Sequence, residues 1–169
     1  MQPSTPDKYR PFPPVPLTGR TWPDKTLSRA PIWMSTDLRD GNQALFEPLD
    51  AGRKLGMFRM LCEIGFKEIE VAFPAASQTD FDFVRTLIAD GHIPDDVSIE
   101  VLTQARPALI ERTIESLAGA KRAIVHVYTA TSPVFRDTVF AMQRNEVVTM
   151  AVDAVRQIRA LTDARPETH

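Results

Sequence analysis

From residue 31 onward, short apolar runs alternate with longer stretches in which hydrophobic side chains recur every three or four positions. The short runs predict buried strands, and the longer stretches predict helices with one apolar face. The predicted strands cover residues 32–36, 68–73, 97–102 and 123–128. The predicted helices cover residues 50–64, 77–91, 107–119 and 147–161.

The order of these elements predicts an α/β fold. Strands that alternate with helices at this spacing form βα units around a parallel sheet. Four such units correspond to the first half of a (β/α)8 TIM barrel, which is the fold class we predict. A small flavodoxin-like sheet is the alternative. No glycine-rich phosphate-binding motif follows a predicted strand, so the sequence gives no support for a nucleotide-binding fold.

Residues 1–30 differ from the rest of the chain because they are rich in proline. They show neither the short apolar runs of buried strands nor the three-to-four-residue spacing of helices. We predict an extended N-terminal arm over residues 1–30 and an incomplete barrel domain over residues 31–169. Tyr9, Phe12 and Trp22 are unusual in a linker, which favours an arm that lies on its own subunit or on a partner subunit. A disordered tail is the alternative.

The composition narrows the functional class. The net charge of −2 gives no reason to expect a nucleic-acid or acidic-lipid partner. The single cysteine, Cys62, excludes an internal disulfide and a cysteine metal cluster. No apolar run reaches the length of a membrane span, and the N-terminus lacks a signal-peptide core. We therefore expect a cytoplasmic protein.

Two predicted strands carry polar side chains on one face. Ile69 and Val71 share a face of the second strand, so Glu70 points the other way. On the fourth strand, His126 and Tyr128 share one face. With the apolar faces against the helices, these polar groups point into the barrel. Burying them is costly unless they are paired or functional, and for Glu70 the two interpretations are evenly balanced.

The segment after the first strand crowds Asp37, Arg39 and Asp40 into four positions, where the active-site loops of a barrel begin. A carboxylate here can bind a hard divalent cation, and a guanidinium can neutralise an oxyanion that develops on a substrate. Gly41 permits a tight turn. A polar loop with an internal Asp–Arg pair is the simpler alternative.

These residues resemble a known family. Residues 38–43 read Leu-Arg-Asp-Gly-Asn-Gln and are followed by Lys54, a signature similar to that of the isopropylmalate and homocitrate synthases. Glu70 matches the second-strand glutamate of their superfamily of metal-dependent TIM-barrel lyases and synthases, which includes enzymes of the HMG-CoA lyase type. Residues 126–128 and 131–132 match its fourth-strand segment. The N-terminal arm and Asn42 are typical of the longer class of isopropylmalate synthases.

The resemblance implies a Claisen-type condensation of acetyl-CoA with 3-methyl-2-oxobutanoate (2-oxoisovalerate), which gives 2-isopropylmalate and CoA in leucine biosynthesis. It implies a divalent metal, Mg²⁺, Mn²⁺ or Zn²⁺, with Asp40 as a ligand. Arg39 and Glu70 are the implied catalytic residues: Arg39 polarises the keto oxygen, and Glu70 orders the site by pairing with Arg39. The implied substrate-binding residues are Arg39, His126, Tyr128 and Thr131.

The sequence also departs from the family pattern. The family's other metal ligands form an H-x-H pair, which is absent from these 169 residues. We therefore expect this chain alone to be inactive and marginally folded, and the full enzyme to be a homodimer. Two alternatives stay open: a part of a sister enzyme of the homocitrate, citramalate or HMG-CoA lyase type, and a non-enzymatic half-barrel that associates with itself.

Overall fold

The structure is a computed structural model of the chain, and it describes residues 13, 16, 18–19 and 29–164. The chain divides into two units, Met1–Ile32 and Trp33–His169, and the strands and helices of the described residues belong to the second. The predicted contacts of Tyr9, Phe12 and Trp22 lie outside the described residues, so the arm stays a prediction.

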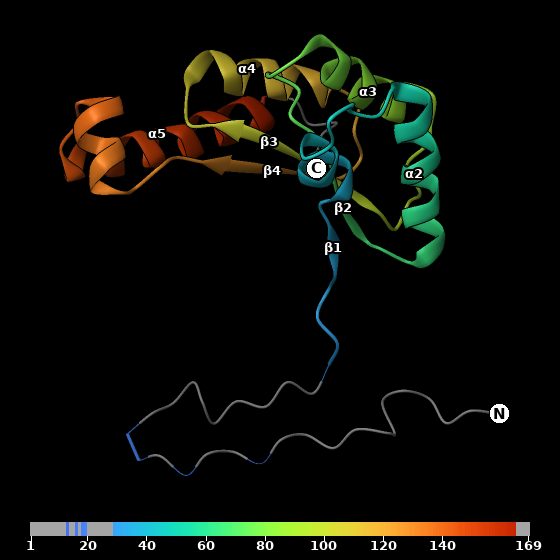
Figure 1. The fold of residues 1–169 in the computed structure, drawn as a ribbon, viewed down its shortest axis with the longest axis horizontal. Helices are drawn as coiled ribbons and strands as arrows, with labels where there is room; N and C mark the ends of the chain where they lie inside the picture. Colours follow the sequence, from blue (N-terminus) through green and yellow to red (C-terminus); the bar gives the residue numbers. More distant parts are fainter. Residues whose placement is uncertain (1–12, 14–15, 17, 20–28, 165–169) are drawn as a thin grey trace. The chain divides into compact units, whose positions relative to one another are not determined.

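A four-stranded parallel sheet forms the centre of the second unit (Figure 1). Its strands lie side by side in chain order, which is the arrangement of successive strands in a βα barrel. The strands are β1 (Met34–Ser35), β2 (Glu68–Ala72), β3 (Ser98–Gln104) and β4 (Ala123–Tyr128). The structure thus confirms the predicted α/β class with its parallel sheet.

Helices connect the strands and pack in sequence, α2 on α3, α3 on α4 and α4 on α5. In Figure 1, α2, α3 and α4 lie along the same outer side of the sheet. The helices are α2 (Ala51–Ile64), α3 (Gln78–Ala89), α4 (Pro107–Ser116) and α5 (Arg144–Asp163). Two short π-helical segments also occur among the described residues, η1 (Asp37–Gly41) and η2 (Phe135–Phe140).

The helix ends follow from local chemistry. Asp50 caps α2, because its Oδ1 accepts a hydrogen bond of 2.8 Å from the Arg53 N–H. Gly65 ends α2 with a φ of 108°, a conformation that disfavours side chains. The Ser77 hydroxyl caps α3, because it accepts a hydrogen bond of 3.1 Å from the Asp80 N–H. The Asp80 carboxylate in turn accepts hydrogen bonds from Lys54 and from the Phe73 N–H.

The strand boundaries differ most from the prediction in β1 and β3. β1 contains only Met34 and Ser35, because it lies at the edge of the sheet and pairs with β2 through these two residues alone. β3 extends to Gln104, whereas the prediction ended it at residue 102. Thr103 and Gln104 are polar, but they continue the ladder with β4. The η2 segment was not predicted, since nothing in its sequence has a helical period.

Two apolar clusters stabilise the unit. The larger one fills the space between strands β2 and β3 and helices α2 and α3 and includes Phe58, Ile69 and Val71. As predicted from strand parity, Ile69 and Val71 are fully buried on the helix side. The smaller cluster lies between α4 and α5 and includes Ile110 and Ala154.

Cys62 on α2 is half-buried and packs against the larger cluster. Burial raises the pKa of its thiol, and the nearby Asp96 carboxylate raises that pKa further. At neutral pH the thiolate fraction is therefore smaller than for a free cysteine. We expect iodoacetamide to alkylate Cys62 more slowly in the folded chain than in urea, as followed by mass spectrometry. Equal rates in the two states would contradict the buried position.

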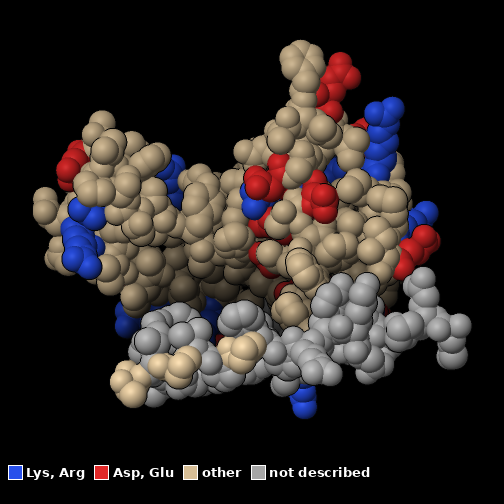
Figure 2. Space-filling view, turned by 60° about the horizontal axis from the view of Figure 1, so that its bottom comes forward, with Lys and Arg blue, Asp and Glu red and all other residues tan. Residues whose placement is uncertain are grey.

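On the face drawn in Figure 2, acidic and basic side chains are mixed, and its described part carries no gathered basic patch. Among the helices within the described ranges, none combines the length and the apolar character that crossing a membrane requires.

Candidate functional site

Polar side chains from four consecutive segments meet towards the carboxyl ends of the strands. Arg39 comes from η1, directly after β1, and Glu70 from β2. Glu100 comes from β3 and His126 from β4. In βα barrels the chemistry lies at this end of the sheet, because the strand ends and the following loops converge there.

The central contact joins Arg39 to Glu70. Arg39 Nε and Nη2 each lie 2.7 Å from Glu70 Oε2, and the Glu70 side chain is 0% exposed. A buried carboxylate needs such a partner to offset its lost hydration. Arg39 Nη1 also lies 2.9 Å from Oδ1 of Asp40, whose side chain is 65% exposed. The Arg39–Glu70 pairing expected from the family resemblance is thus present.

The η1 segment aims Arg39 at this contact. The carbonyl of Thr36 accepts hydrogen bonds from the N–H groups of Arg39, Asp40 and Gly41, at 3.2, 2.9 and 3.2 Å. The widened turn buries Leu38 completely in the larger cluster and leaves Asp40 at the surface. π-helical turns of this kind are frequent at functional sites. The simpler alternative, a polar loop with an internal Asp–Arg pair, has its Arg39–Asp40 contact here, but backbone hydrogen bonds order the segment into a turn.

His126 lies between two carboxylates. Its Nδ1 is 3.0 Å from Glu70 Oε1 and 3.2 Å from Glu100 Oε1. The strand register brings the carboxylates together, since Glu70 and Glu100 are direct neighbours across β2 and β3. Burial raises the pKa of Glu100, and the charge of Glu70 raises it further, whereas His126 lowers it.

A cavity of about 300 Å³ opens beside these groups. It is lined by Arg39, Gln43, Phe73, Leu102, His126 and Tyr128. Gln104 Nε2 donates a hydrogen bond of 2.8 Å to the Tyr128 hydroxyl, which fixes that ring at the rim. Thr131, predicted to bind substrate, is exposed and does not line this cavity; its carbonyl accepts a hydrogen bond of 3.1 Å from Arg136.

Sequence reasoning missed Glu100 and Gln104. Both lie on β3, on the face that Leu102 presents to the cavity. Residues 97–102 contain one charged side chain among mainly apolar ones, and such a residue in a buried strand is a signal for a paired or functional group. The prediction read this stretch as an apolar strand and gave Glu100 no weight.

Three of these residues could also hold a metal ion. One ligand atom from each of Glu70, Glu100 and His126 lies within 4.8 Å of the other two. Carboxylate oxygen and imidazole nitrogen suit divalent cations such as Mn²⁺ and Zn²⁺. Asp40, the predicted ligand, is not one of the three, and its assignment stays a prediction.

Lys54, noted in the sequence without a role, is part of the frame of the site. It lies on α2, its side chain is 1% exposed, and its Nζ donates a hydrogen bond of 2.8 Å to Asp80 Oδ1. The Phe73 N–H donates to the other oxygen of Asp80 at 2.9 Å. The ammonium also lies 4.6 Å from the Phe83 ring centroid. These contacts tie α2, α3 and the end of β2 together.

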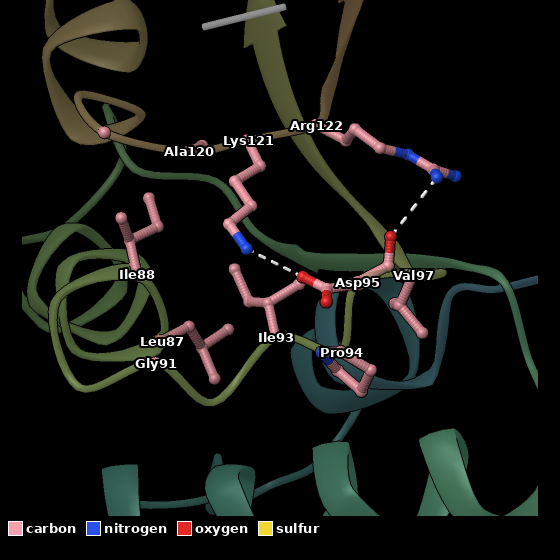
Figure 3. A pocket seen from close by; sticks show the side chains of 11 residues that line it. Leu87, Ile88, Gly91, Ile93, Pro94, Asp95, Val97, Ala120, Lys121 and Arg122 are labelled. Carbon is pink, nitrogen blue, oxygen red and sulfur yellow. Dashed lines mark hydrogen bonds and ion pairs between the residues drawn. The ribbon is translucent and has the colours of Figure 1, made fainter. Parts of the chain in front are cut away.

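A second cavity, of about 250 Å³, lies at the amino ends of β3 and β4 (Figure 3). Its rim carries an ion pair of 2.7 Å between Lys121 and Asp95, and Arg122 donates to the Asp95 carbonyl at 3.3 Å. This end of a parallel barrel sheet is normally structural. The cluster around Arg39 therefore remains the candidate site.

Comparison with known proteins places the chain in a family context. Residues 30–166 match the family described as HMGL-like. A 2-isopropylmalate synthase from Ralstonia nicotianae is 70% identical over 161 residues, which is 95% of this chain and 28% of that protein. The 2-isopropylmalate synthase from Ralstonia pickettii is 69% identical over the same shares. That from Parvibaculum lavamentivorans is 62% identical over 96% of this chain and 29% of its own length. The chain thus spans less than a third of these relatives.

Proposed function

Because this chain belongs to the HMGL-like family, we propose that it forms the first part of the catalytic barrel of a 2-isopropylmalate synthase. The proposed reaction joins the methyl carbon of acetyl-CoA to the keto carbon of 2-oxoisovalerate. Hydrolysis of the thioester then releases CoA and 2-isopropylmalate. The observation that carries the proposal is the Arg39–Glu70 pair beside an open cavity, in a chain so similar to enzymes of that name.

Arg39 acts on the keto oxygen in this proposal. Negative charge develops on that oxygen when the carbon nucleophile attacks, and a guanidinium held in place stabilises it without reorganisation. Glu70 holds the guanidinium through Nε and Nη2, so Nη1 is the nitrogen directed away from that contact. His126 and Tyr128 line the cavity and shape the pocket for the 2-oxo acid. Thr131 belongs to that pocket in the proposal by family resemblance alone.

A divalent cation, Mg²⁺, Mn²⁺ or Zn²⁺, is part of the proposal. The donor chemistry fits, because Asp40 offers an exposed carboxylate next to Arg39. Glu70, Glu100 and His126 are the less accessible donors, since they already bind one another and Arg39. We therefore assign Asp40 as the ligand that this chain supplies. When bound, the ion would supply Lewis-acid chemistry at the keto oxygen.

Acetyl-CoA as the second substrate, a role in leucine biosynthesis, a cytoplasmic location and a homodimeric assembly complete the proposal. They rest on the resemblance and on the names of the relatives. In the first alternative, a sister enzyme of the homocitrate, citramalate or HMG-CoA lyase type, Arg39 would act in the same way on another substrate. In the second alternative, a half-barrel that associates with itself, Arg39 would have no catalytic role.

The proposal can be tested with a chimera in which the aligned residues of this chain replace the matching 161 residues of the Ralstonia nicotianae enzyme. We expect the chimera to release CoA from acetyl-CoA in the presence of 2-oxoisovalerate and Mg²⁺, Mn²⁺ or Zn²⁺. CoA thiol is measured with a chromogenic disulfide. The unmodified Ralstonia enzyme is the positive control.

Two controls separate the alternatives. Reactions with 2-oxoglutarate or pyruvate in place of 2-oxoisovalerate identify a sister enzyme if one of them gives the higher kcat/KM. A folded chimera that releases no CoA with any of the three acids would refute an enzymatic role for this segment. Light scattering of the 169-residue chain then tests the self-associating alternative.

A further inference from the structure

We propose that Glu100 is a positioning residue, which binds Nδ1 of His126 and thereby directs Nε2 of that ring into the cavity beside Arg39. The inference deepens the proposed function and rests on it for the identity of the ligand, a 2-oxo acid. Its first element, the orientation of His126, is independent of any activity.

The contacts at Nδ1 define the tautomer of His126. Glu70 Oε1 at 3.0 Å and Glu100 Oε1 at 3.2 Å both face this nitrogen. A carboxylate accepts hydrogen bonds, so the nitrogen between two carboxylates carries the proton. In a neutral ring Nε2 is then the unprotonated nitrogen. Free histidine favours the opposite tautomer, so the site selects this one.

Glu100 adds what Glu70 alone does not supply. The other oxygen of Glu70 accepts a hydrogen bond from Arg39 Nε and forms an ion pair with Arg39 Nη2, so Arg39 holds this carboxylate in place. One acceptor sets a distance to Nδ1 but leaves the ring free to tilt about that hydrogen bond. A second acceptor on the neighbouring strand restricts the tilt. The two carboxylates are register partners, so their spacing is set by the sheet.

The burial of Glu100 supports a role beyond packing. The residue is 6% exposed on a strand whose neighbours Ile99 and Val101 are fully buried. An apolar side chain would cost less there, because a buried carboxylate loses its hydration. The raised pKa of Glu100 is a sign of that cost. His126 is the polar partner that the described residues offer it.

The opposite side of the ring is accessible to a ligand. The His126 side chain is 42% exposed and lines the cavity together with Arg39 and Tyr128. A ring held through Nδ1 presents Nε2 to this space as a hydrogen-bonding group at a fixed position. In the proposed reaction it contacts an oxygen of the 2-oxo acid that Arg39 polarises.

Two substitutions test the role of Glu100. Glu100→Gln keeps an acceptor oxygen near Nδ1, whereas Glu100→Leu removes it at similar volume. The ring nitrogens of the 169-residue chain, labelled with ¹⁵N-histidine, report the tautomer, and His126→Asn identifies the signal among those of His92 and His169. We expect the Nδ1–H tautomer in the unmodified chain and in Glu100→Gln, and a mixture of tautomers in Glu100→Leu.

Kinetics of the chimera give an independent readout. Loss of one hydrogen bond that orients a ligand-binding group corresponds to about a tenfold rise in KM for the 2-oxo acid in Glu100→Leu. The KM for acetyl-CoA should not change, and Glu100→Gln should restore the low KM. A merely structural role would instead alter the amount of folded protein in both variants.

The inference is overturned by an Nε2–H tautomer in the unmodified chain, or by Glu100→Leu leaving both the tautomer and the KM unchanged. A shift of the Nδ1 signal on titration with Zn²⁺ alone would also overturn it, because Nδ1 would then be a metal ligand. If instead the proposed function is wrong, the unmodified chimera is inactive, and the tautomer of His126 can still be measured in the 169-residue chain. If the isolated chain gives no folded spectrum, the KM values decide.

Discussion

Arg39→Gln should lower kcat/KM of the chimera for 2-oxoisovalerate by about 10²–10³-fold, the usual effect of removing one group that stabilises a developing oxyanion. Glutamine cannot supply the positive charge, and it leaves Glu70 buried without its guanidinium partner. The kcat/KM of Arg39→Lys should lie between that of the unmodified chimera and that of Arg39→Gln, because an ammonium keeps the charge but cannot bind through two nitrogens. Initial rates of CoA release measure all three proteins.

The matched control is Arg156→Gln on α5. Arg156 is 76% exposed and pairs with Asp153 one turn away, so its charge is removed without changing the site. We expect this variant to retain the activity of the unmodified chimera. If Arg39→Gln also retained it, Arg39 would have no role in the reaction and the proposed chemistry would fail.

Lys54→Met should lower the free energy of unfolding of the chain by about 1.5–3 kcal/mol, the usual worth of a hydrogen bond to a charged group, because Asp80 keeps 23% of its side chain exposed. Methionine fills a similar volume, so the loss reports the uncompensated Asp80 carboxylate rather than a void. Urea titration followed by circular dichroism measures the change. If the isolated chain is only marginally stable, as the sequence led us to expect, this loss appears as an unfolded variant without urea.

Lys121→Met is the control for this experiment. Lys121 is 81% exposed and pairs with Asp95 at a similar distance, so solvent already screens the interaction. We expect almost no loss of stability. Asp80→Asn added to Lys54→Met should recover part of the loss, because the amide oxygen can still accept from the Phe73 N–H. Equal effects of Lys54→Met and Lys121→Met would refute a buried ion pair.

Strand parity made much of the site predictable. Successive side chains point to opposite faces, so Ile69 and Val71 on the helix side require Glu70 on the other. The same rule placed His126 on the inner face. Which residues then meet is another matter, because it depends on the register between strands. The pairing of Glu70 with Glu100, and so the second carboxylate on His126, could not be read from one strand at a time.

The backbone irregularities were also beyond the sequence pattern. The η1 turn depends on one carbonyl, that of Thr36, which receives three N–H groups. Its formation is favoured by burial of Leu38, a tertiary effect that no local propensity expresses. The family resemblance identified Arg39 as important but contained no information about this turn.

The Asp80 carboxylate has a consequence for engineering the substrate range of the proposed enzyme. One of its oxygens binds Lys54 in the core, and the other binds the backbone of Phe73, which lines the cavity. A library of variants that changes only cavity residues keeps the contacts of Asp80, so the backbone of Phe73 stays in place and only the side chains that line the cavity differ. A library that also changes Lys54 or Asp80 lets the Phe73 backbone shift. We expect its members to lose discrimination between 2-oxo acids before they gain a new preference.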